Sequence, residues 1–187
     1  MKKILFAILL AVIYFAITLG CMFLGFVSPV LWVYQPVISA FLAATPVLIA
    51  CRNWKKFGAV LIFPAVLTVL LIFSGEASGT FRICSLLIVL AASELVRKLM
   101  GYESKNGARL SYAVVSLIPI CPILLLWLDT KFYYSGAVSE MGQAYANSLM
   151  KMATPFGLIL LIALTFLAGY LGAIVSEKIF KDKVELK

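Results

Sequence analysis

Residues 4–26 read ILFAILLAVIYFAITLGCMFLGF and contain no charged side chain. About 20 consecutive apolar residues are enough for an α-helix to cross the hydrocarbon core of a bilayer. A signal peptide also begins with basic residues, here Lys2 and Lys3, but its apolar core is only about 7 to 15 residues long. The length of this run therefore predicts a first transmembrane helix.

Five further apolar runs follow, and the predicted helices cover about residues 4–26, 31–51, 58–73, 81–99, 110–128 and 152–175. Hydrophobic residues make up 64% of the chain, charged residues 13%, and the mean hydropathy is +1.08. A soluble domain carries about 25% charged residues. We expect an all-α integral membrane protein, a bundle of six transmembrane helices that forms a single domain over residues 1–187. Pro119 and Pro122 predict an interruption of the fifth helix, whereas Pro36 and Pro46 are expected to be tolerated within the second.

The distribution of basic residues predicts the orientation of these helices. Most of the 16 Lys and Arg residues fall on one side, in the segments 2–3, 52–56, 97–109 and 178–187. The other side holds only Arg82, Lys131 and Lys151. Since Lys and Arg are enriched in cytoplasmic loops, both termini are predicted to lie in the cytoplasm, with outer loops at 25–30, 74–80 and 129–151. The net charge of +8 would suggest a nucleic-acid partner in a soluble protein, but the clustering of these basic residues between apolar runs indicates orientation in a lipid bilayer instead.

Several kinds of chemistry are excluded by residues that the chain lacks. It has no histidine, so Ser-His triads and HExxH zinc sites cannot form. Its four cysteines are scattered singly, without metal-ligand spacing, and no metal or cofactor is expected. Asp129 and Asp182, the only aspartates, fall on opposite sides, which argues against an intramembrane enzyme. No GxxxxGK[ST] motif occurs, so ATP-driven transport would need an ATPase from another chain.

A candidate ligand site lies on the predicted outer side, where polar and aromatic residues gather at helix ends and loops. Small-ligand sites are commonly cavities with apolar walls and a few convergent polar groups. Arg82 stands out as a lone cation at a helix end, where either Glu76 or an anionic ligand could pair with it. The alternative is an interfacial belt, since Trp and Tyr gather at membrane surfaces in all membrane proteins. The candidates are Trp32, Tyr34, Gln35, Glu76, Arg82, Trp127, Lys131, Tyr133, Tyr134, Tyr145 and Asn147.

Two patterns on the opposite side are interpreted structurally or as contacts with a partner. Glu94 precedes Arg97 and Lys98 by three and four residues, a spacing that predicts a local ion pair on one helix face. Ala7 and Ala11 form a small-xxx-small pattern, which lets helix backbones approach closely. Internal packing and docking of a partner helix both remain open for these alanines.

A family resemblance rests mainly on the fifth predicted helix. The segment LSYAVVSLIPI at 110–120, continuing to LWL at 126–128 and preceded by GYESK at 101–105, resembles the Trep_Strep family, also called MptD-like. The likeness extends through Glu140-Met141 and Ala144-Tyr145 into the sixth helix. Members of that family are regarded as substrate-binding S components of energy-coupling factor (ECF) transporters.

The resemblance implies a six-helix protein that captures a micronutrient from outside and is not an enzyme. Such components dock on a transmembrane T component with two ATPase subunits, through an Ala-x-x-x-Ala face on the first helix that Ala7 and Ala11 match. They topple in the membrane to release the substrate inside. The aromatic outer loops suit a vitamin, pterin or tetrapyrrole, with Arg82 or Lys131 meeting a carboxylate or phosphate. Haem would need an axial ligand other than histidine, such as Tyr, Met or Cys, and is not favoured. The alternative function is a small structural or assembly protein that binds partner helices without a ligand.

Overall fold

The computed structural model describes the backbone of residues 2–73 and 79–180, and side chains from residue 5 onward. These residues form helices and turns, with no strand in the described ranges. The elements are α1 (Lys2–Met22), η1 (Phe23–Phe26), α2 (Pro29–Leu42), α3 (Ala44–Asn53), α4 (Ile62–Phe73), α5 (Thr80–Met100), α6 (Lys105–Val115), η2 (Ile118–Leu124), α7 (Leu125–Leu128), α8 (Thr130–Met141), α9 (Gln143–Met150) and α10 (Pro155–Ile179).

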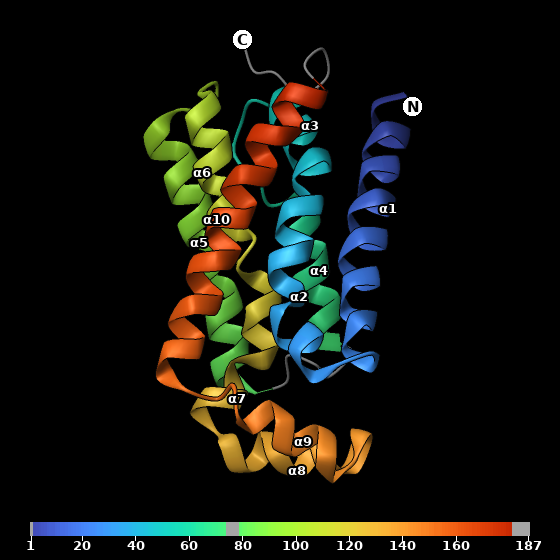
Figure 1. The fold of residues 1–187 in the computed structure, drawn as a ribbon. Coiled ribbons are helices and arrows are strands. Elements are labelled where there is room, and N and C mark those ends of the chain that lie inside the picture. The colour runs from blue at the N-terminus through green and yellow to red at the C-terminus, as the bar shows by residue number, and fades with distance from the viewer. Residues whose placement is uncertain (1, 74–78, 181–187) are drawn as a thin grey trace.

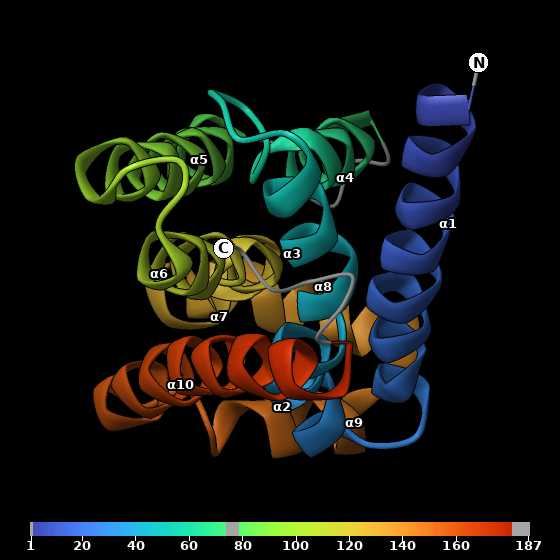
Figure 2. The same cartoon turned by 90° about the horizontal axis from the view of Figure 1, so that it is seen from above.

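The long helices run alongside one another as a bundle, and α8 and α9 lie across one end of it (Figure 1). We call this end the cap end, and the helices α8 and α9 the cap. The start of α1, the connection between α5 and α6 and the end of α10 lie together at the opposite end (Figure 1). Viewed along the bundle, α1 stands at its edge, whereas α6 and α3 lie inside (Figure 2).

Four helical stretches are long and apolar enough to cross a membrane: Leu5–Phe26, Pro29–Asn53, Lys105–Leu128 and Pro155–Ile179. They confirm a multi-pass helical membrane protein. The apolar helix Ile62–Phe73 is shorter, and α5, although 21 residues long, carries charged residues near both ends. The expected six-span count is therefore supported for four segments, and the crossing of α4 and α5 stays a prediction.

Two predicted helices are divided where prolines interrupt the backbone hydrogen bonding. The interruption of 110–128 is confirmed, because α6 ends at Val115 and the two prolines lie in the 3-10 segment η2. The continuous helix expected at 31–51 is wrong, since α2 ends at Leu42 and α3 begins at Ala44. Pro46 explains this break, because its ring lacks an N–H and clashes with the carbonyl of the residue four positions earlier.

The predicted start of the third helix at residue 58 is also corrected. Gly58 adopts a positive φ of 84° and belongs to a turn, so α4 begins only at Ile62. The predicted polar loop 129–151 is instead almost entirely helical, as α8 and α9. Gly142, with φ of 87°, provides the turn between them. Polarity indicated a surface position correctly but not the absence of secondary structure.

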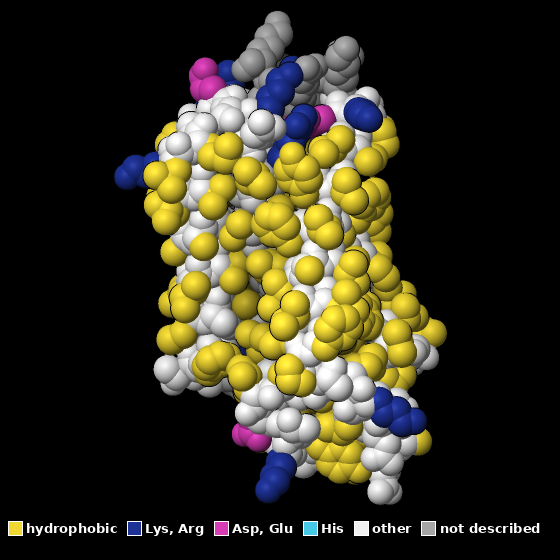
Figure 3. Space-filling model, turned by 60° about the vertical axis from the view of Figure 1, so that its left-hand side comes forward, with side chains coloured by type: hydrophobic (Ala, Val, Ile, Leu, Met, Phe, Trp, Pro, Cys, Tyr) yellow, Lys and Arg dark blue, Asp and Glu magenta, His cyan; other side chains and the backbone are white. Residues whose placement is uncertain are grey.

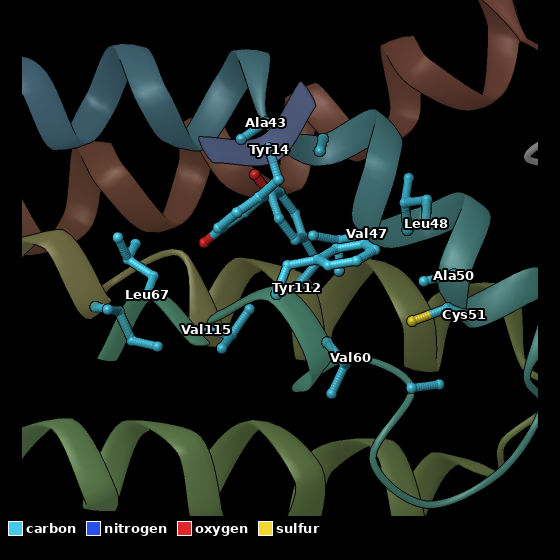
Figure 4. Close-up of a cluster of buried hydrophobic side chains, with 14 of the residues drawn as sticks. Tyr14, Ala43, Val47, Leu48, Ala50, Cys51, Val60, Leu67, Tyr112 and Val115 are labelled. Atoms are coloured by element: carbon cyan, nitrogen blue, oxygen red, sulfur yellow. The ribbon is translucent and has the colours of Figure 1, made fainter. Parts of the chain in front are cut away.

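The core contains two buried tyrosines, Tyr14 from α1 and Tyr112 from α6 (Figure 4). The Tyr112 hydroxyl donates to the carbonyl oxygen of Ala40 at 2.7 Å, beside the break between α2 and α3. Elsewhere α10 approaches α2 so closely that a Cβ on Gly172 would lie 2.4 Å from the Phe41 carbonyl oxygen. Small residues of this kind let membrane helices pack backbone to backbone. On the face seen in Figure 3, hydrophobic side chains cover most of the surface between the two ends, and the charged side chains lie near the ends.

Candidate functional site

The cap is positioned by the local sequence on both sides of it. The Asp129 carboxylate accepts a hydrogen bond from the Phe132 N–H at 3.1 Å and so caps the start of α8. The Thr154 hydroxyl accepts from the Gly157 N–H at 3.0 Å at the start of α10, where Pro155 occupies the first helical position. These two hydrogen bonds fix the start of α8, where the chain leaves the bundle, and the start of α10, where it returns. The cap, α8 and α9, lies between these two points (Figure 1).

Three hydrogen bonds join aromatic side chains across the cap end. The Trp32 indole N–H donates to the Tyr133 hydroxyl at 2.6 Å, and thus joins α2 to α8. The Tyr145 hydroxyl donates to the Gly25 carbonyl oxygen at 2.6 Å, and thus joins α9 to η1. Burial raises the pKa of Tyr145, so its hydroxyl stays protonated and able to donate around neutral pH. The Trp127 indole N–H donates to the Thr154 carbonyl oxygen at 2.9 Å.

An apolar cluster beneath these bonds attaches the cap to the bundle. Leu149 of α9 is buried with Val33 of α2, Leu126 of α7 and Leu161 of α10. Tyr34, Tyr133 and Tyr145 pack against the same cluster. The cap is therefore a packed part of the protein, and moving it would break both polar and apolar contacts.

A small cavity lies among α1, α2, α4 and η2, near the cap end. Its volume of about 10 Å³ is enough for roughly one water molecule. The Gln35 side chain is only 2% exposed, and its Oε1 atom has no hydrogen-bond partner. Within the described part of the chain, no charged side chain lines the cavity. The lining residues are Thr18, Met22, Trp32, Gln35, Leu67, Leu71, Pro119, Pro122 and Ile123.

The structure brings together some of the residues predicted from sequence. Trp32 and Gln35 line the cavity, Tyr133 holds Trp32, and Tyr145 attaches the cap. Trp127 bonds to the start of the last helix and packs, like Tyr34, against the apolar cluster. The aromatic candidates named here therefore either line the cavity or hold the helices at the cap end together.

The charged and exposed candidates lie elsewhere. Lys131 is exposed on α8, and Arg82 is half-buried in the first turn of α5; neither is among the cavity-lining residues. The Tyr134 hydroxyl donates to the amide oxygen of exposed Asn147 at 3.0 Å, a contact within the cap. Glu76 lies outside the described residues. The expected meeting of Arg82 or Lys131 with a ligand therefore has no counterpart in the cavity lining.

Other lining residues were not identified from sequence as candidates. Pro119 and Pro122 were considered only as helix breakers, and Leu67, Leu71 and Met22 are ordinary apolar residues. Thr18 was the one usable signal among them, because it is a buried hydroxyl in an otherwise apolar helix. Its convergence with Gln35 depends on how α1 and α2 are rotated against each other, which a sequence does not state.

The opposite end contains buried charges with partners other than those predicted. The Tyr102 hydroxyl donates to Glu94 at 3.1 Å, while Arg97, fully buried, donates to the carbonyl oxygens of Tyr102 and Ser104. The expected local pairing of Glu94 with Arg97 is thus replaced by contacts that hold the connection between α5 and α6. Burial and the bond to Glu94 raise the pKa of Tyr102.

Ala7 and Ala11 lie on the inner side of α1. Both are half-buried, and Ala11 packs against the core cluster that includes Leu10 and Tyr14. The outward surface of the helix is formed by larger residues such as Leu9 and Val12. In this conformation Ala11 supports internal packing, and the role of both alanines in docking stays a prediction.

The helical bundle with an apolar exterior defines a multi-pass integral membrane protein, with the cell membrane as its location. The chain belongs to the Trep_Strep family, whose model is described as a hypothetical bacterial integral membrane protein and matches residues 1–184. This match confirms the resemblance noted from the sequence. No curated protein and no solved structure matches the chain.

Proposed function

We propose that this protein is the substrate-binding membrane subunit, the S component, of an ECF-type importer. In this role it captures a micronutrient from outside and delivers it with energy from ATPase subunits on other chains. The small cavity near the cap end, lined by a buried glutamine whose Oε1 atom has no hydrogen-bond partner, is the observation that carries the proposal. A binding subunit needs such a site, whereas catalysis by this subunit is not required.

The arrangement of the two ends supports an outward-facing cavity. The basic segments 52–56 and 97–109 and the end of α10 lie at the end opposite the cap (Figure 1). Since basic residues favour the cytoplasmic side, the cap and cavity face outward in the proposed orientation. The proposed topology has six membrane crossings, with both termini in the cytoplasm.

The proposed partners are an ECF transmembrane T component and two ATPase subunits. In this proposal α1 forms the docking surface, and the backbone of the partner helix comes nearest to α1 at Ala7 and Ala11. Because both alanines are half-buried, a partner helix could reach them fully only if α1 moved away from the core. In the most apolar stretch of each span, 22% of the residues are buried in the first span, against 67%, 61% and 28% in the other three, so α1 is the least buried of these four spans.

A second function, assembly of partner helices without a ligand, is favoured by the small size of the cavity. Ligand sites commonly have volumes of about 300 to 1,000 Å³. The cavity here is about 10 Å³, so a binding subunit would have to open in order to load. An assembly protein would need no such movement.

One experiment distinguishes the two functions. The protein is purified in detergent from cells grown in rich medium. Native mass spectrometry then identifies any small molecule bound in a one-to-one ratio, and the same preparation is examined for the T component and ATPases. A stoichiometric ligand supports the S component, and its ATP-dependent uptake should be lost in cells that lack this protein. If the protein carries no bound molecule from any growth medium and no ATPase subunit co-purifies with it, the assembly function is supported instead.

A further inference from the structure

The unpaired oxygen of Gln35 is the strongest sign of what the cavity recognises. The cavity has two other polar groups, and both already have partners within the protein. The Thr18 hydroxyl donates to the Tyr14 carbonyl oxygen at 2.9 Å, and the Trp32 indole N–H donates to Tyr133. Gln35 Oε1 is the buried acceptor that remains. Buried polar groups are nearly always hydrogen-bonded, so an exception is expected to have a reason.

The wall beside Gln35 explains why the protein itself supplies no donor. Pro119 and Pro122 have no backbone N–H. The remaining neighbours are side chains such as Leu67 and Leu71, which cannot donate a hydrogen bond. Among the described residues no group donates to Gln35 Oε1, so we assign this donor to a molecule that enters the cavity. The glutamine carboxamide also carries N–H donors, so it can recognise a donor and an acceptor side by side.

The described lining residues carry no charge, and this limits what can enter the cavity. Arg82 and Lys131 are not among the lining residues, and the cavity has apolar walls apart from Gln35, Thr18 and Trp32. Burying an ionised carboxylate or phosphate without a counter-charge is strongly unfavourable. A neutral ring, in contrast, gains from the indole and proline walls.

From these observations we propose that the substrate is an uncharged, ring-containing molecule whose neighbouring N–H and C=O groups pair with the Gln35 carboxamide. This inference rests on the proposed function as a binding subunit and adds the substrate class to it. It differs from the expectation from sequence, in which Arg82 or Lys131 meets an anionic group. Any charged part of the substrate would have to remain outside the cavity.

The size of the cavity adds a requirement for movement. A volume of about 10 Å³ admits a water molecule but not a ring, so the walls must separate when the substrate enters. Thr18 and Met22 belong to α1, the span with few buried residues, and Trp32 is held by the cap. Binding is therefore coupled to displacement of α1, of the cap, or of both.

The test uses Gln35→Leu, with Gln143→Leu as a matched control at an exposed position on α9. Each variant is purified like the wild type from cells grown in rich medium, and the mass of any bound molecule is determined. Thermal unfolding is measured on protein from minimal medium, after native mass spectrometry has shown that nothing is bound. Arg82→Gln and Lys131→Gln are examined in the same way.

We expect the wild type, the Gln143 variant and both charge variants to retain a bound molecule that is neutral at pH 7, or neutral in its ring part. Gln35→Leu should lower its occupancy at least tenfold. Without ligand, Gln35→Leu should unfold at a higher temperature than the wild type, because it removes a buried group that has no partner. This gain in stability separates a ligand contact from a structural role.

Three results would overturn the substrate class while leaving the binding subunit intact: a bound anion that is lost with Arg82→Gln, a ligand retained by Gln35→Leu, or destabilisation of the ligand-free Gln35→Leu protein. The absence of any bound molecule in wild-type preparations would instead reject the proposed function, and the inference with it.

Discussion

Gly25 is the residue at which one added methyl group tests the packing of the cap end most directly. A Cβ at this position would lie 2.4 Å from Trp32 Cε3 and 3.1 Å from Cδ2. Carbon atoms in contact are normally about 3.5 to 4.0 Å apart, so the indole ring would have to shift by roughly 1 Å. The same ring lines the cavity and donates to Tyr133, so Gly25→Ala disturbs the packing and a hydrogen bond together.

The expected loss of stability has two parts. Overpacking a well-packed site costs about 1 to 3 kcal/mol, and the lost hydrogen bond adds about 1 kcal/mol. A total of about 2 to 4 kcal/mol corresponds to a decrease of roughly 4 to 16 °C in the unfolding midpoint of a chain of this size. Thermal unfolding in detergent, followed by tryptophan fluorescence, measures this shift.

Gly20 offers the matched control on α1, because nothing lies within 4 Å of a Cβ built there. Gly20→Ala should leave the midpoint unchanged or raise it slightly, since alanine favours a helix by about 0.5 to 1 kcal/mol. In a Trp32→Leu background, Gly25→Ala should have little further effect, because the obstructing ring is gone. The reasoning would be refuted if Gly25→Ala and the wild type had equal unfolding midpoints. It would also be refuted if Gly25→Ala lowered the midpoint as much in the Trp32→Leu background as in the wild type.

Three further predictions concern the cap, a buried ion pair and the topology. Tyr145→Phe removes the hydrogen bond from α9 to η1, worth about 1 kcal/mol, and should speed amide hydrogen exchange in α9 several-fold. Tyr134→Phe removes only an exposed bond within the cap and should not speed this exchange. Equal exchange rates in the two variants would contradict the proposed attachment of the cap. Arg109 pairs with Glu177, whose side chain is only 8% exposed, and Lys55 pairs with Glu103, which is largely exposed. Arg109→Met leaves Glu177 unpaired and should destabilise the protein by about 1.5 to 3 kcal/mol, whereas Lys55→Met should change its stability by less than about 1 kcal/mol. Equal losses of stability in thermal unfolding would refute this difference. Ser139→Cys in a cysteine-free background should react with a membrane-impermeant maleimide in intact cells, and labelling only after lysis would reverse the proposed orientation.

Much of the architecture is predictable because the bilayer imposes strong constraints on sequence. A run such as 4–26 has to form a helix in lipid, where every backbone polar group needs an internal partner. The break beside Ala43 was not predicted, because membrane helices can tolerate proline when neighbouring helices satisfy the freed groups. Here the Tyr112 hydroxyl bonds to the Ala40 carbonyl beside the break, and that contact joins residues 72 positions apart.

The candidate site was predictable in part, and the errors have a common origin. Trp32 and Gln35 were found because polar and aromatic residues at a helix end are unusual in an apolar sequence. Arg82 and Lys131 have the same character, but they are not among the residues that line the cavity. Sequence identifies which residues are chemically suited to bind, but it does not contain the rotation of each helix about its axis.

The sequence alone determined the membrane class, the positions of most long helices and the clustering of basic residues toward one end. These features depend on the transfer of side chains between water and lipid, which composition and order describe directly. Only the tertiary structure showed that residues 130–150 form a packed helical cap, and that the Gln35 Oε1 atom is buried beside proline and leucine side chains without a partner among the described residues. Those features depend on contacts between segments far apart in the chain, and such contacts exist only once the helices have packed.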